Sequence, residues 1–343
     1  MFGKSHRLNF RLSVDLISLD LVTMTTHAPY IRVPPCFSPQ YVQHSPFRLL
    51  DLPWELRNEI YGWVLRSTRI TYGPGGMPGA NHTFKPTINK SRRYSLALLC
   101  TCQRIKEDIG SRWLGWVLFN FQSPESLLDI LTELPTTKVA AIRHVRVNGR
   151  CIALSLPDIG VSYGLASVLK LVPQLQLDTL TVLGACSKSF GSDTARDFYR
   201  TLNHLVALGN GWKELHYVHS DSYLLSFPAN GVLWRPCLRK PQPDAWRQAL
   251  YRRDGPDSGA SVTIYRSSSG IPGSILQRDE QELFEQHVAP QDLEGYALEC
   301  DPFLSSESER QKEILVVVKR GRGAKVMEEM FEPWASEDEI YDH

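Results

Sequence analysis

Residues 50–65 read LDLPWELRNEIYGWVL, and this stretch predicts a helix with a sharp start and a broad apolar surface. Pro53 suits the first helical position, where its missing N–H costs nothing, and Glu55 in the first turn is favourable to the helix dipole. One group of apolar residues shares a side at helical spacing, namely Leu52, Leu56, Ile60, Trp63 and Val64. A second group lies further round the helix, beyond Arg57, and comprises Trp54, Tyr61 and Leu65.

Two apolar groups are more than a single core contact requires, because a helix that lies on one core needs one apolar stripe. The predicted helix can therefore pack inward and still offer side chains to a neighbouring domain or a second protein. The alternative is that both groups are buried within the chain. In either case we expect Leu56 and Ile60 to be buried.

A second helical pattern covers residues 96–113, where apolar side chains recur at Leu98, Leu99, Cys102, Ile105, Ile109 and Trp113. This pattern predicts that Cys102 belongs to the core. Between the two helices, residues 66–95 are rich in Gly and Pro, which predicts a loop insert with room for a short strand at 70–72. An aromatic strand is expected after the second helix, at 117–121.

This order of motifs resembles the F-box-like domain found in a large set of fungal proteins, over roughly residues 47–147. The first motif is carried by Leu52, Pro53, Glu55, Leu56, Arg57, Ile60, Tyr61 and Leu65. The second is carried by Leu99, Thr101, Cys102, Ile105 and Glu107, and the aromatic strand by Phe119 and Phe121. An ordinary F-box runs through its helices in a compact block, whereas here the insert 66–95 separates them.

Beyond residue 117 the chain alternates between short apolar strands and helical patterns. The strands are expected at 117–121, 141–147, 177–183, 214–218, 261–266 and 313–319. The helices are expected at 126–134, 164–172, 194–208, 245–252 and 280–287. Helix–strand alternation predicts an α/β (or α+β) fold with a mainly parallel sheet, because parallel neighbours need crossovers. The arrangement is either an irregular leucine-rich-repeat-like layer, with strands on one side and helices on the other, or a simple open sheet.

Four regions follow from these patterns. Residues 1–46 are predicted to be a flexible leader, 47–121 the F-box-like helical module with its insert 66–95, 122–330 the α/β region, and 331–343 an acidic tail. The basic run 319–325 follows the last strand, and a contact with phosphate or with the acidic tail is one interpretation of it. A solvated turn is the other.

Composition limits the classes of function. The net charge of +1 in 343 residues gives no reason to expect a nucleic acid or membrane partner. The seven cysteines are scattered, which indicates a reducing compartment, cytoplasmic or nuclear, and predicts neither a disulfide framework nor a zinc site. The sequence carries none of the common hydrolase, metalloprotease, nucleotide or dinucleotide motifs, so we expect no cofactor, no metal and no enzyme activity.

The leading hypothesis is therefore protein–protein interaction. The resemblance implies a substrate receptor whose F-box-like helices dock on a Skp-type adaptor of a cullin–RING ubiquitin ligase while the α/β region holds a target protein. The predicted partner-binding residues are Leu52, Pro53, Trp54, Leu56, Tyr61 and Leu65. A second hypothesis is a scaffold protein with no ubiquitin link, and a third is an enzyme of unrecognised class.

Overall fold

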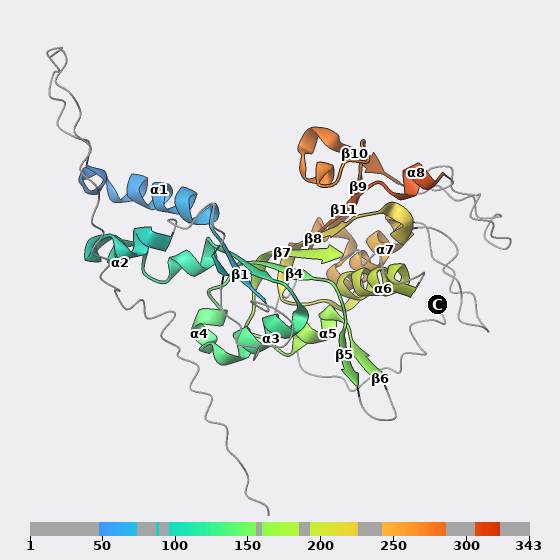
Figure 1. The fold of residues 1–343 in the computed structure, drawn as a ribbon, viewed down its shortest axis with the longest axis horizontal. Helices are drawn as coiled ribbons and strands as arrows, with labels where there is room; N and C mark the ends of the chain where they lie inside the picture. Colours follow the sequence, from blue (N-terminus) through green and yellow to red (C-terminus); the bar gives the residue numbers. More distant parts are fainter. Residues whose placement is uncertain are drawn as a thin grey trace, which may run out of the picture.

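A computed structural model of the chain describes residues 48–73, 87–88, 96–155, 160–184, 193–225, 242–285 and 306–322. The predicted leader 1–46, the predicted tail 331–343 and most of the insert 66–95 lie outside the described residues. Figure 1 shows a central sheet with α1 and α2 at one end.

The sheet has nine strands in the order β10-β9-β11-β8-β7-β4-β3-β1-β2. Its strands are β1 Arg69–Tyr72, β2 Thr87–Ile88, β3 Leu118–Phe121, β4 His144–Asn148, β7 Leu177–Gly184, β8 Trp212–His219, β9 Ser261–Ser267, β10 Gln281–Phe284 and β11 Ile314–Lys319. A separate antiparallel hairpin consists of β5 Ile152–Ser155 and β6 Gly160–Tyr163. All six strands predicted beyond residue 117 are present, and so is the short strand predicted at 70–72.

The α-helices are α1 Trp54–Arg66, α2 Gln103–Ile109, α3 Pro124–Glu133, α4 Thr136–Val139, α5 Leu165–Lys170, α6 Asp193–Leu208, α7 Asp244–Asp254 and α8 Glu307–Arg310. Short 3-10 turns include η4 Leu96–Cys100, η5 Arg112–Gly115 and η9 Arg278–Glu280. The start of α3 shows how local sequence sets a boundary. The Ser123 hydroxyl accepts a hydrogen bond from the Ser126 N–H, and Pro124 occupies the first turn, where it needs no backbone partner.

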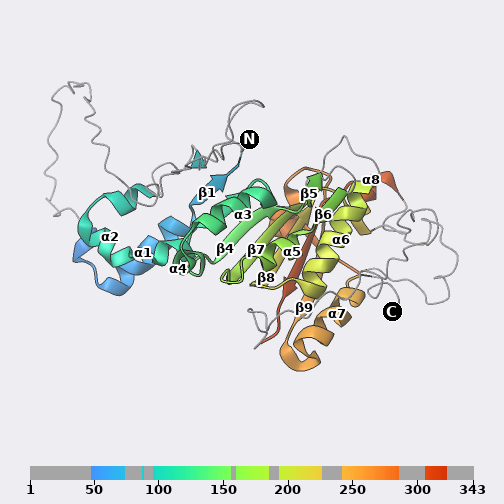
Figure 2. The ribbon, with the colours of Figure 1, turned by 90° about the horizontal axis from the view of Figure 1, so that it is seen from below.

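Strands β1, β3, β4, β7 and β8 are parallel neighbours in chain order, so every crossover moves in the same direction across the sheet. Right-handed crossovers that all move one way place their helices on one face. Helices α3, α5, α6 and α7 accordingly form a row on that face (Figure 2). The predicted layering, with strands on one side and helices on the other, is present. The sheet is mixed, because β11 runs antiparallel to both β8 and β9.

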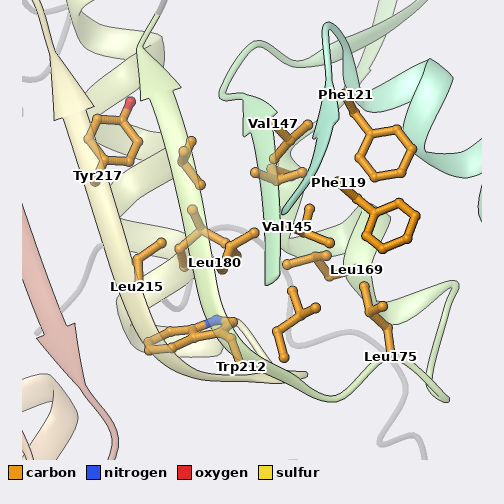
Figure 3. Packing of buried hydrophobic residues seen from close by; sticks show 14 of the residues in the cluster. Phe119, Phe121, Val145, Val147, Leu169, Leu175, Leu180, Trp212, Leu215 and Tyr217 are labelled. Carbon is orange, nitrogen blue, oxygen red and sulfur yellow. The ribbon is translucent and has the colours of Figure 1, made fainter. Parts of the chain in front are cut away.

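Burial alternates along the strands, and the buried residues face the helices. Side chains of β3, β4, β7 and β8 gather with Leu169 of α5 and with Leu175 of the following turn (Figure 3). The same cluster of buried residues runs from Tyr61 of α1 to Val318 of β11. Both the sheet and the core therefore cross the boundary predicted between residues 121 and 122, since β3 pairs with β4 over the whole of its length.

Two predicted helices differ in the structure. The helix predicted at 280–287 is wrong within its described part, because Gln281–Phe284 pairs antiparallel with β9 and turns Phe284 into the core. The edge of β9 supplies hydrogen-bonding groups that override the weak helical pattern.

The helix predicted over 96–113 is broken into η4, α2 and η5. Cys102 is extended at the start of α2, and Gly110 ends the helix at a φ of 52°, a conformation that favours glycine. Because of this break, Cys102 leaves the apolar side of the predicted helix and is exposed, so its predicted place in the core is wrong.

Candidate interaction surface on α1

Helix α1 buries the side that carries Arg57, Tyr61, Gly62 and Leu65. The spacing of Arg57, Tyr61 and Leu65 is four residues, so these side chains form one stripe along the helix. Tyr61 and Leu65 are fully buried and belong to the continuous core. Burial, together with the nearby carboxylate of Asp108, raises the pKa of the Tyr61 phenol, which keeps it protonated as a hydrogen-bond donor.

Arg57 ties α1 to α2 and to the turn before it. Its Nε lies 3.1 Å from Oδ2 of Asp108, and the Tyr61 hydroxyl donates to the same oxygen at 3.3 Å. Its Nη1 donates to the carbonyl oxygens of Leu50 and Leu52, each at 3.2 Å. A buried guanidinium needs such partners, because an unpaired buried charge is costly. The orientation of α1 is therefore set by this ion pair.

The opposite side of α1 exposes large apolar side chains. Leu56 is 48% exposed, Ile60 38% and Trp63 69%. Their spacing of four and three residues puts them in one row, which we call the apolar stripe. The prediction that Leu56 and Ile60 are buried is wrong. Both sides of this helix are apolar, and the Arg57–Asp108 ion pair turns the Tyr61–Leu65 side inward.

The predicted partner-binding residues separate into two sets. Pro53 and Leu56 are exposed, and Leu52 is partly exposed. Tyr61 and Leu65 are core residues, so in this structure they are not available to a partner. Ile60, which was expected to be buried, and Trp63 of the same apolar group both lie on the outer side of α1.

Trp54 lies between the buried and exposed sides. It is 37% exposed, and the guanidinium of Arg112 stands 4.5 Å from the centre of its ring. Arg112 also donates to the Asn58 side chain at 3.1 Å. The cation over the ring covers part of the indole, so Trp54 offers a partner less free surface than Trp63 does.

Charged side chains border the apolar stripe. Glu55 and Glu59 are exposed on the adjoining face of α1, and Arg66 is exposed at its end.

The buried side of α1 does have a signal in the sequence, which is the four-residue spacing of Arg57, Tyr61 and Leu65. Local spacing alone does not identify this side, because arginine is seldom buried without a partner and the partner here, Asp108, is distant in sequence.

Arg320, the first arginine of the basic run after β11, stabilises the fold. The Arg320 guanidinium makes three contacts of 2.7–3.0 Å with the carboxylate of Asp254, and the Gly321 N–H donates to the same carboxylate at 2.9 Å. The Arg320 side chain also stands over the Trp212 ring. Arg320 is therefore committed to joining β11 to the end of α7 and is not free to bind phosphate.

Within the described part of the chain, no three His, Cys, Asp or Glu side chains come together as a metal site would require. The same residues include no helix long and apolar enough to cross a membrane. Comparison with protein-family models, with curated proteins and with solved structures finds no match to this chain.

Proposed function

We propose that this chain is a protein-interaction module that binds its partner through the apolar stripe of α1. The observation that carries the proposal is the outward row of Leu56, Ile60 and Trp63 on a helix whose opposite side is already anchored in the core. Contiguous exposed apolar surface on a folded protein marks interaction sites. Because Arg57 and Asp108 fix the helix, the stripe is presented without any rearrangement of the core.

The partner we propose is a Skp-type adaptor of a cullin–RING ubiquitin ligase, which follows from the resemblance of residues 50–65 and 96–113 to the F-box-like domain. Three apolar side chains can form only the centre of such an interface, because stable interfaces bury about 1,200–2,000 Å² in total. The exposed Pro53, the partly exposed Leu52 and the neighbouring α2 supply the surrounding surface. In this proposal the rest of the sheet holds the target protein.

Direct capture of the purified chain on an immobilised Skp-type adaptor tests the proposal. We expect the unmodified chain to bind, and the double substitution Ile60→Ser, Trp63→Ser to abolish capture, because apolar anchors at the centre of an interface carry most of its binding energy. Both side chains are exposed, so the thermal melt of the double variant should stay close to that of the unmodified chain.

The matched control is the pair Leu171→Ser, Ile271→Ser, which removes two exposed apolar side chains from other parts of the surface. This variant should bind as the unmodified chain does. Absence of binding by the unmodified chain would remove the ubiquitin-ligase role. The chain would then be a scaffold protein that uses the same stripe for another partner. Equal loss of binding in both double variants would show that the stripe has no special part in docking.

A further inference from the structure

The face of the sheet turned away from α3, α5, α6 and α7 carries a row of mostly polar side chains. Strand register aligns one row across seven strands of this face, made of Thr71, Asn120, Arg146, Thr181, His216, Val317 and Thr263. These side chains are partly exposed, whereas the residues that flank them along each strand are mostly buried against the helices. We call this surface the polar face.

Among the described residues, two arginines of the polar face have no hydrogen-bond or ion-pair partner. Arg69 on β1 and Arg146 on β4 each bury their Nε, and neither Nε has a hydrogen-bond partner. Across the described segments, no hydrogen bond or ion pair involves either guanidinium. Only β3 separates the two strands, and Asn120 of β3 stands beside Arg146 in the register.

Arg69 and Arg146 lie on the same face of the sheet, with only β3 between their strands, and their like charges oppose each other. Burial lowers the pKa of Arg146, and the positive charge of Arg69 lowers it further. Burial also lowers the pKa of the neighbouring His144. The negative charge of Asp178 raises that pKa, and the positive charges of Arg66 and Arg143 lower it. Positive charges therefore gather at this end of the polar face.

Asp178 does not neutralise the two arginines, because its carboxylate already accepts a 2.7 Å hydrogen bond from Lys213. Three arginines whose side chains are less than 10% exposed do have acidic partners. The pairs are Arg57 with Asp108, Arg320 with Asp254 and Arg266 with Glu309. Arg69 and Arg146 depart from this pattern, and a partly buried cationic pair is costly unless an anion joins it.

We propose that Arg69 and Arg146 form a binding site for a phosphate group on the polar face. Two planar guanidinium groups can each offer paired N–H donors to oxyanion oxygens, and their two positive charges match a dianion better than a single carboxylate. Asn120 adds a donor, because its amide uses one N–H on Thr71 Oγ1, at 3.1 Å, and keeps a second. The site is separate from the apolar stripe, so it does not depend on the function proposed for α1.

Calorimetric titration of the full chain with inorganic phosphate, at constant ionic strength set with chloride, tests this site. We expect saturable binding and, at saturating phosphate, a rise in melting temperature of about 2–5 °C that chloride does not reproduce. Arg146→Gln should weaken phosphate binding about tenfold or more. Arg146→Lys should weaken it less, because lysine keeps the charge and loses the paired donors.

Arg252→Gln is the matched control, since it removes one exposed positive charge from α7 on the helical side and should leave phosphate binding unchanged. Without phosphate, Arg146→Gln should melt no lower than the unmodified chain, because it relieves the repulsion with Arg69. A lower melt in that buffer, together with a phosphate response equal to that of chloride, would show that the arginines are structural and overturn the site.

A second titration identifies the source of the phosphate. A short phosphoserine peptide is compared with its unphosphorylated form and with inorganic phosphate. Tighter binding of the phosphopeptide than of phosphate, lost in Arg146→Gln, indicates a phosphorylated protein as the ligand. Equal binding of the two indicates a small phosphate compound. Equal binding of the phosphorylated and unphosphorylated peptides would contradict the proposal.

Discussion

The two faces of the central sheet differ in their polar side chains and in the partners of their arginines. On the helix-covered side the strands bury apolar residues, and the charged Arg320 is paired with Asp254. On the polar face the corresponding row is polar, and Arg69 and Arg146 have no acidic partner in the described chain. Charge on the helical side therefore serves the fold, whereas we propose that the arginines of the polar face bind a ligand.

The largest expected effect tests the helix-covered side. Phe121 is almost fully buried on the helix-covered side of β3, and Phe121→Ala should lower the free energy of unfolding by about 3–5 kcal/mol through loss of burial and the cavity left behind. The measurement is urea denaturation. Thr181→Ala on the polar face is the control and should change stability by about 0.5 kcal/mol or less. Similar losses in both variants would abolish the distinction between the faces.

A second test compares the two sides of α1. Leu65→Ala should destabilise by about 2–5 kcal/mol, because its side chain is fully buried, whereas Leu56→Ala should cost less than about 1 kcal/mol. Thermal or urea unfolding of the two variants measures this difference. The reverse order would mean that α1 turns its Leu56 side inward, and the apolar stripe would then be part of the core.

The third test concerns the charged pair on the helical side. Burial alone would raise the pKa of Asp254, but hydrogen bonds from Arg320 and from the Gly321 N–H hold that pKa below its ordinary value. Asp254→Asn should therefore destabilise by about 1.5–3 kcal/mol at neutral pH. A carboxylate with a lowered pKa in the folded state contributes its stability above the unfolded pKa of about 4, and this contribution is lost as the pH falls further.

The unmodified chain and Asp254→Asn should accordingly differ in free energy of unfolding by the full amount at pH 6–7. This difference should shrink below about pH 4. Urea unfolding at several pH values measures it. Asp257→Asn, which changes an exposed carboxylate nearby, should show little effect at any pH. A loss that stays the same down to pH 2 would mean that the Asp254 charge contributes nothing.

The smallest expected effect sharpens the description of α1. Arg112→Ala removes the cation above the Trp54 ring and should cost about 0.5–1 kcal/mol. The same change should make the Trp54 indole more accessible to a fluorescence quencher, with Trp54→Phe identifying its signal. Arg104→Ala, an exposed position on α2, serves as the control. No change in either measurement would show that Arg112 does not cover Trp54 in solution.

The sequence predicted the buried side of the main strands but not the buried side of α1, and the reason is physical. Along β4 and β8, buried and partly exposed residues alternate, so the period of two both identifies a strand and decides which side faces the core. Along α1 both sides are apolar, so the helical period identifies the helix without deciding its rotation. The inward side depends on the contact of Arg57 with Asp108 of α2, a residue far from Arg57 in sequence.

The sequence by itself determined the α/β character, the positions of β3, β4, β7, β8, β9 and β11 and the helical nature of residues 54–66, because these follow from local periodicity and from Pro, Gly and Ser at element ends. Tertiary structure decided which side of α1 is buried, that 281–284 joins β9 as a strand, and that Arg69 and Arg146 lie on one face of the sheet. Each of these depends on contacts between residues far apart in the chain, and no local pattern records such contacts.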